Sequence, residues 1–170
     1  MVVQNNYMVP LVNGDIVEVV EVGAEEPART KSLLHFRRVT VKDIATGAQH
    51  STLLLEDTLY QSQPNLDKKQ QCDLFVDFIM SEKKKGIEPK KNPQTFKKDM
   101  MDDPYLNALR CSWGYAVTCH KAQGGEWDEV YLDIRRNITL NPVKEAYQWV
   151  YTAITRAKKK LHVTKDFFIE

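Results

Sequence analysis

Short apolar stretches separated by polar turns occupy the chain from residue 9 to residue 60. The first of them is rich in β-branched residues with carboxylates spaced through it, a composition typical of a strand. An Asn-Gly dipeptide at 13–14 precedes it and favours a tight turn, because both residues tolerate positive φ. The predicted strands are Ile16–Val22, His35–Val41 and Gln49–Leu55, with a polar loop at Gly23–Lys31 and a turn at Asp43–Gly47. Several short strands joined by polar turns predict a small β-barrel of the SH3-like kind.

The hydrophobic pattern takes on a helical period after Pro64. Apolar residues at 74, 75, 78 and 79 share one face of a helix predicted over Leu66–Lys84. Three lysines and Gly86 follow at its C-terminal end, where cations and a glycine favour termination. Two shorter helices are predicted at Thr95–Met101 and Pro104–Arg110.

Strand and helix patterns alternate over the last 60 residues. Apolar runs predict buried strands at Trp113–Thr118 and Glu129–Ile134, and a closing strand at Lys160–Thr164. A helix is predicted from Asn141 to about Ala157, because a capping side chain followed by proline at the first helical position is a good start. This order predicts part of an α/β sheet that is too short to be a whole doubly wound domain.

Composition narrows the possible functions only slightly. The formal net charge of the 170 residues is +1, so any basic surface must come from local clustering. The three cysteines lack Cys-x-x-Cys spacing, which argues against a metal site or a disulfide framework and favours a reducing cytoplasmic location. No apolar run approaches the roughly 20 residues that span a bilayer, so we expect no membrane partner. Lysine runs at 83–85, 90–91, 97–98 and 158–160 are compatible with a DNA path, although solvated surface is their commoner role.

A loop suited to phosphate groups follows the predicted strand at 113–118. Residues 114–128 read Gly-Tyr-Ala-Val-Thr-Cys-His-Lys-Ala-Gln-Gly-Gly-Glu-Trp-Asp. The hydroxyl of Thr118, the imidazole of His120 and the ammonium of Lys121 all suit the phosphate oxygens of a nucleic-acid strand. Glycines at 124 and 125 let main-chain N–H groups approach a ligand, and Glu126 is an acceptor suited to sugar hydroxyls. An ordinary glycine turn between strands is the simpler explanation when so short a fragment stands alone.

Arg156 is the second candidate site residue, within the stretch Tyr-Thr-Ala-Ile-Thr-Arg-Ala-Lys at 151–158. A guanidinium is always charged, and its rigid fork of donors fits the γ-phosphate of a nucleotide during hydrolysis. Taken alone, Arg156 is better explained as a surface arginine that interacts favourably with a helix C-terminus.

Together the two stretches, about 25 residues apart, resemble motifs V and VI of superfamily-one DNA helicases, in the RecD/Dda-like branch. An Asn-Asn-Tyr at 5–7 and an Asn-Gly-Asp-Ile at 13–16 are similar to the segment that leads into the small β domain of those enzymes. The resemblance is close over residues 4–22 and 112–165. It implies an α/β fold class: part of a RecA-like motor domain (2A) with an inserted SH3-like β-barrel and a helical insertion. The implied domains are 1–62 for the barrel with its lead-in strand, 63–111 for the helical insertion, and 112–170 for the motor part.

The resemblance also implies a role for each candidate residue. Thr118, His120 and Lys121 would contact the backbone of single-stranded DNA. Three residues would form the nucleotide side of the motor cleft, with the carboxylate near the ribose: Gln123, Gly124 and Glu126. Arg156 would be the catalytic arginine finger, and movement along DNA would run 5′ to 3′ by analogy with the family.

The chain departs from the family pattern in two respects. It contains no Gly-x-x-x-x-Gly-Lys-Ser/Thr loop or Walker B carboxylate, and the motif IV arginine is also missing. ATP and Mg²⁺ would therefore be bound mainly by an N-terminal RecA-like domain, in the same polypeptide or as a separate partner. We expect no cofactor or metal to bind this chain alone, and no ATPase activity from it. It is expected to be the C-terminal part of a larger enzyme, of use in DNA repair or recombination.

Two other readings of the sequence stay open. The second is a non-catalytic nucleic-acid-binding module that retains a degenerate motor remnant, although the presence of Arg156, Glu126 and Gln123 together favours the helicase. The third is a regulatory domain that docks a partner through the Leu66–Lys85 helix. Tryptophans at 113 and 127 flank the first motif, and we expect them in the core or the cleft wall rather than stacked on bases.

Overall fold

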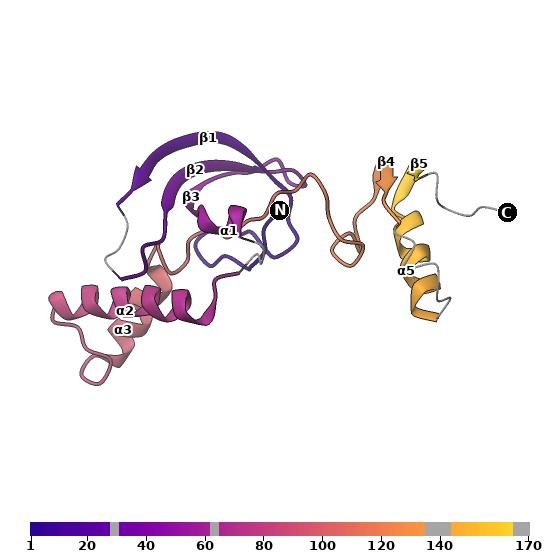
Figure 1. Ribbon diagram of the computed structural model, residues 1–170. Coiled ribbons are helices and arrows are strands. Elements are labelled where there is room, and N and C mark those ends of the chain that lie inside the picture. Colours follow the sequence, from indigo (N-terminus) through magenta and orange to yellow (C-terminus); the bar gives the residue numbers. More distant parts are fainter. Residues whose placement is uncertain (28–30, 62–64, 135–143, 165–170) are drawn as a thin grey trace. The chain divides into compact units, whose positions relative to one another are not determined.

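The computed structural model describes residues 1–27, 31–61, 65–134 and 144–164 (Figure 1). Contacts between residues divide the chain into two compact units, Met1–Gly114 and Tyr115–Glu170. The first unit holds both the predicted barrel segment and the predicted helical insertion. The chain is therefore a mixed α/β protein with small sheets, and the finer division into three domains stays a prediction.

An antiparallel sheet of three strands forms the body of the first unit. Its strands are β1 (Val17–Glu26), β2 (Phe36–Asp43) and β3 (Gln49–Leu55), hydrogen-bonded in that order. All three predicted strands are confirmed. β1 runs further than predicted, through part of the expected polar loop, and its register against β2 shifts twice along the way.

Short pairings continue the sheet beyond β3 and back to the start of β1. Leu109 bonds to β3, since its amide donates to the Leu53 carbonyl at 2.6 Å and its carbonyl accepts from the Leu55 amide at 3.0 Å. Val2 pairs with Cys111, and the Val2 amide donates to the Asp15 carbonyl at 2.8 Å. These bonds link β3, through residues 109–111 and Val2, to the residues just before β1, but the sheet itself has three strands, so the barrel stays a prediction. So does its assignment to the SH3-like class.

Apolar side chains are buried on both faces of this sheet. One cluster packs the N-terminal segment against the sheet: Val2, Leu11, Val39, Val41, Leu54, Leu109 and Cys111. The other lies on the opposite face and receives residues from the helical segment: Leu34, Phe36, Leu53, Leu55, Leu66, Leu74 and Ala108. Because neighbouring residues of a strand point to opposite faces, the Leu53-Leu54-Leu55 run contributes to both clusters.

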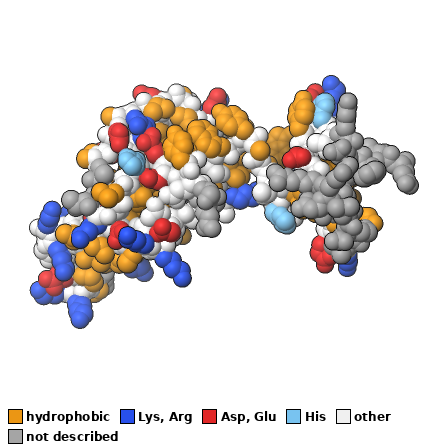
Figure 2. All heavy atoms as spheres, in the orientation of Figure 1, with side chains coloured by type: hydrophobic (Ala, Val, Ile, Leu, Met, Phe, Trp, Pro, Cys, Tyr) orange, Lys and Arg blue, Asp and Glu red, His pale blue; other side chains and the backbone are white. Residues whose placement is uncertain are grey.

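Three helices complete the first unit: α1 (Asp57–Tyr60), α2 (Lys68–Lys84) and α3 (Pro93–Asp102). Asp67 begins α2 with a capping box, in which its carboxylate accepts from the Gln70 amide at 2.7 Å. The Asp77 carboxylate accepts from the backbone amides of Lys31 and Ser32, which ties α2 to the segment before β2. Lysine side chains gather over the α2 and α3 end of this unit (Figure 2).

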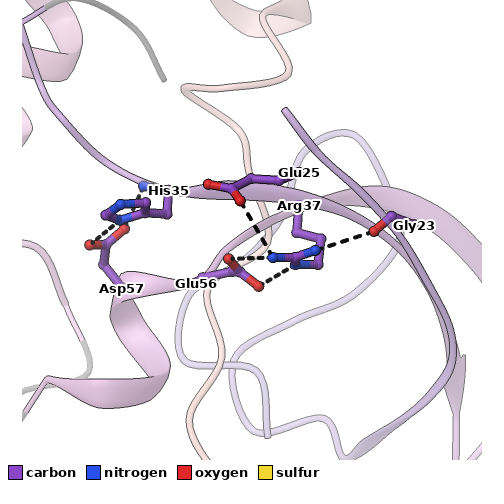
Figure 3. A network of polar contacts seen from close by, with 6 residues as sticks. All are labelled: Gly23, Glu25, His35, Arg37, Glu56 and Asp57. Carbon is purple, nitrogen blue, oxygen red and sulfur yellow. Dashed lines mark hydrogen bonds and ion pairs between the residues drawn. The ribbon is translucent and has the colours of Figure 1, made fainter. Parts of the chain in front are cut away.

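A polar network fastens α1 to the sheet (Figure 3). The Arg37 guanidinium donates to both carboxylate oxygens of Glu56 and lies 3.7 Å from the Glu25 carboxylate. The hydrogen bond to Glu56 raises the pKa of Arg37 further above its usual range. The His35 amide donates to the Asp57 carboxylate at 2.7 Å, so the start of α1 is held at the start of β2.

A small parallel βαβ arrangement makes up the described part of the second unit. Its elements are β4 (Trp127–Leu132), α5 (Lys144–Ile154) and β5 (Ala157–Val163). β4 and β5 pair in parallel, from Trp127 against Ala157 to Leu132 against Val163. The strand predicted at 129–134, the helix and the closing strand are confirmed in type and approximate position. The predicted helix start at Asn141 and Pro142 lies outside the described residues.

Three local predictions are wrong. Residues 113–118 form an irregular segment with a bend at 115–116 rather than a buried strand, and Trp113 and Tyr115 are exposed. Residues 104–107 form turns rather than a helix, because the Asp103 carboxylate accepts from the Tyr105 and Leu106 amides and holds the chain in a tight turn. The stretch predicted to be β structure as far as Tyr60 ends instead in the helix α1. No helix among the described residues is long and apolar enough to cross a membrane.

Candidate functional site

Successive turns shape the segment from Thr118 to Gly125. The Thr118 carbonyl accepts from the Lys121 amide at 2.9 Å and from the Ala122 amide at 3.0 Å. The Ala122 carbonyl in turn accepts from the Gly125 amide at 3.1 Å. Because its backbone groups bond to one another, this loop keeps a defined path without strand partners. Ala122 is its one described residue that is buried.

The side chains predicted to contact DNA all lie on the outside of these turns. Thr118, His120 and Lys121 are exposed, and so are the predicted nucleotide-side residues Gln123 and Glu126. The turn brings Thr118 and Lys121 together through their backbone hydrogen bond. The Lys121 amide also lies 3.4 Å from the Thr118 hydroxyl. An exposed hydroxyl, imidazole and ammonium on one loop can bond phosphate oxygens without displacing core residues.

The two glycines of the loop are required for different reasons. Gly124 has φ +83°, in the left-handed region that side chains disfavour. A Cβ on Gly125 would clash with the Trp127 ring, so a larger residue there would require the indole to move. Trp127 is 40% exposed, so its ring covers the loop at the surface. Trp113 is exposed as well, so neither tryptophan lies in the core, and their expected place in a cleft wall stays a prediction.

Arg156 joins the end of α5 to the glycine loop. Its Nη1 donates to the Gly125 carbonyl at 3.1 Å, its Nε to the Thr152 carbonyl at 2.9 Å and its Nη2 to the Thr155 hydroxyl at 3.0 Å. The Arg156 carbonyl also accepts from the Trp127 amide at 2.9 Å. The two sequence motifs are therefore in direct contact in the structure, as a common site requires.

Cys119 makes a second link between the loop and α5. Its Sγ donates to the Trp149 carbonyl at 3.4 Å. Burial raises the pKa of the Cys119 thiol, and the Arg156 charge partly offsets this effect. A thiol held protonated against a helix carbonyl acts as a packing group rather than a reactive one.

Carboxylates of β4 face lysines of β5 along the sheet. Glu126 lies 3.7 Å from Lys158, Asp128 lies 2.9 Å from Lys159, and Glu129 lies 3.3 Å from Lys160. All six side chains are largely exposed, so each pair adds little stability. The pairing does affect the site, because a ligand hydroxyl at Glu126 would compete with Lys158 for the carboxylate.

Sequence reasoning missed the protein partners of Arg156. The Gly125 and Thr152 carbonyls are backbone atoms, and no side-chain pattern announces them. Thr155 could have been suspected from its position beside the arginine. In the described part of the chain, three of the five guanidinium N–H groups have protein acceptors, which leaves two for an anionic ligand.

A known protein family matches the segment that contains both motifs. Residues 114–164 match the UvrD-like helicase C-terminal domain. The match begins four residues before Thr118 and ends one residue after β5, so it contains both motifs and every candidate residue. It supports a superfamily-one helicase C-terminal region in the second unit, and with it helicase and DNA-binding character.

A relative from an archaeon shows a similar stretch. The protein described as "Uncharacterized protein MJ1519", from Methanocaldococcus jannaschii, is 39% identical over 61 residues. These residues are 36% of this chain and 5% of the relative. The similarity is therefore confined to a small part of a much longer protein.

Proposed function

We propose that this chain is the C-terminal part of an ATP-dependent DNA helicase of the RecD/Dda-like branch, and that it contributes single-stranded DNA contacts and the arginine-finger side of the ATP site. The observation that carries the proposal is the contact of Arg156 with the Gly125 carbonyl, which joins the two motifs within the matched segment. A nucleic-acid motor needs a link between its DNA-contacting loop and the cation that would face the nucleotide, and this contact would supply it.

The exposure of the small parallel sheet supports the same proposal. Parallel sheets are normally covered by helices on both faces. In β4, by contrast, every described side chain is exposed or half-buried, and the buried apolar residues of the described second unit are Ala122, Ile134 and Ala153. Further elements of a RecA-like domain would cover these faces. ATP and Mg²⁺ would then lie mainly on a second RecA-like domain, with Gln123, Gly124 and Glu126 on the facing side.

Binding of single-stranded DNA by the 170-residue chain tests the role of the loop. We expect Lys121→Ala to weaken binding of every sequence alike, because the ammonium contacts backbone phosphate rather than a base. The salt dependence of the binding constant should become shallower by about 0.7 in log–log slope, the loss of one phosphate contact on a single strand. Fluorescence anisotropy with labelled oligonucleotides at several salt concentrations measures both.

Lys144→Ala is the matched control, since Lys144 is an exposed lysine of the same unit that belongs to neither motif. It should leave both the affinity and the salt slope nearly unchanged. A loss confined to some sequences, or an equal loss in the control, would contradict a specific backbone contact at Lys121.

One observation favours a second candidate function, a nucleic-acid-binding module without catalysis. The three protein acceptors of Arg156 are what a purely structural arginine would have. In that case the guanidinium holds the glycine loop for DNA binding and never reaches a nucleotide. The effect of Arg156 substitutions on ATP turnover separates the two functions.

A further inference from the structure

A concentration of positive charge lies at the junction of α2 and α3 in the first unit, outside the matched segment. Residues 83–98 contain seven lysines and one carboxylate, Glu88, which gives +6 for 16 residues, whereas the whole chain carries +1. All seven lysines are exposed. We call residues 83–98 the basic tip.

Only part of this charge is neutralised within the protein. Lys85 bonds to the buried Glu82 carboxylate at 2.7 Å, which raises the pKa of Lys85, and Lys91 lies 3.2 Å from Glu88. Among the described residues the other five make no ion pair: Lys83, Lys84, Lys90, Lys97 and Lys98. Like charges held close together repel, so a bound anion would relieve the repulsion among these lysines.

The hairpin that presents these lysines is built with little core. None of the residues of α3 is buried, and its N-terminus lacks a side-chain cap. Phe96 of α3 packs on Phe78 of α2, with ring centroids 5.3 Å apart, and so places Lys97 and Lys98 beside the C-terminal half of α2. Lysine side chains gather over this end of the unit in Figure 2. Burial therefore contributes little to the stability of α3, and most of its surface is open to a ligand.

We propose that the basic tip binds the phosphate backbone of nucleic acid, as a contact separate from the loop around Lys121. The choice of nucleic acid over another polyanion rests on the proposed function. Lysines suit this role because each ammonium is a compact charge that contacts phosphate without regard to sequence. Its aromatic residue, Phe96, is half-buried against Phe78, so the tip offers no ring for base stacking and should not distinguish sequences.

The test compares two pairs of exposed lysines on neighbouring helices, using the full chain. Lys97→Gln with Lys98→Gln removes two charges from the tip. Lys68→Gln with Lys69→Gln removes two charges from the opposite end of α2 and is the control. We expect the tip variant to bind single-stranded DNA more weakly at low salt and to lower the log–log salt slope by about 1.4, while the control changes neither. Exchanging all five unpaired lysines should lower affinity on the order of tenfold or more, with equal effect on different sequences.

A comparison with Lys121→Ala separates this inference from the proposed function. Loss of affinity in both variants supports both sites. Loss in Lys121→Ala alone overturns the tip as a nucleic-acid contact and leaves the loop in place. Loss in the tip variant alone leaves the tip in place and removes the DNA role of the loop. If the tip variant keeps full DNA affinity but loses binding to phosphatidylserine vesicles, the tip binds lipid and the inference is wrong. Circular dichroism and urea unfolding show that each variant is folded.

Discussion

At the scale of single residues, the proposed function depends most on the position of Arg156. Its guanidinium is held by the end of α5 and by the glycine loop at the same time. Under the proposed function, such an arginine would pass a change at a bound nucleotide to the loop proposed to contact DNA, because releasing the Gly125 carbonyl would free the loop as well. The same contacts make Arg156 important for local structure, so a useful experiment must separate the two roles.

Arg156→Ala is expected to lower ATP turnover on the order of a thousandfold in a complete enzyme that also carries the ATP-binding domain, while DNA affinity stays nearly unchanged. The reason is that a finger arginine stabilises charge in the transition state rather than binding the polynucleotide. Steady-state ATPase assays and DNA-binding titrations on the same preparations measure the two effects. Arg156→Lys keeps the positive charge but lacks the forked N–H donors of a guanidinium, so it should recover only a small part of the ATP turnover.

A merely structural Arg156 would give a different result. ATP turnover, DNA affinity and the urea midpoint would then fall together in Arg156→Ala. Near-normal turnover in a folded variant would exclude the finger role outright.

At the scale of elements, the β2–β3 hairpin shows how one side chain holds a turn. The Asp43 carboxylate accepts from the Thr46 hydroxyl and from the Ala45 amide, the latter at 3.0 Å. These hydrogen bonds, led by the one from Thr46, hold the pKa of Asp43 below its usual value. Because the folded pKa is the lower one, the ionised carboxylate stabilises the folded state above the unfolded pKa of about 3.9. That contribution is lost as the pH falls through the folded pKa.

Thr46→Ala is therefore expected to destabilise the chain at pH 7 and to have much less effect near pH 2. Urea unfolding of the native chain and the variant at both pH values measures the difference. Thr46→Ser keeps the hydroxyl and should behave like the native chain at both. An equal loss of stability at the two pH values would mean that the hydroxyl acts by packing and not through the carboxylate.

At the scale of the whole molecule, contacts between distant parts of the chain complete the first unit. The Val3 amide donates to the Arg110 carbonyl at 3.0 Å, and the N-terminal ammonium donates to the Ser112 carbonyl at 2.8 Å. Cys111 lies inside this closure, where burial raises the pKa of its thiol to about 11. Opening of the first unit should therefore be required before this thiol reacts.

The three cysteines should be alkylated in a fixed order at pH 8. Cys72 is exposed and should react first, Cys119 is half-buried and should follow, and Cys111 should stay protected in the native protein. At three pH units below its pKa, about one Cys111 thiol in a thousand is ionised, and that fraction is buried as well. Mass spectrometry of peptides after timed iodoacetamide treatment gives the three rates. Urea should raise the Cys111 rate in step with unfolding, and rapid labelling of native Cys111 would contradict the closure.

The sequence by itself determined most helices and strands of the described chain and the chemistry of the candidate site. The hydrophobic pattern located α2 because this helix buries one face, and β3 because this strand buries a continuous apolar run. Both features can be recognised locally from the order of apolar residues. The two motifs identified the candidate site residues, and all of these lie within the segment that matches one family. Local capping also sufficed for α2, where Asp67 and Gln70 are neighbours in sequence.

Only the tertiary structure decided how those pieces meet. The apolar residues at 113–118 favoured a strand. A strand needs a partner, however, and its pairing depends on distant segments rather than on these residues themselves. The contact of Arg156 with Gly125 joins a side chain to a backbone carbonyl 31 positions away, which no residue pattern encodes. The basic tip likewise depends on the packing of Phe96 against Phe78, which gathers lysine runs that are separate in sequence onto one end of a hairpin.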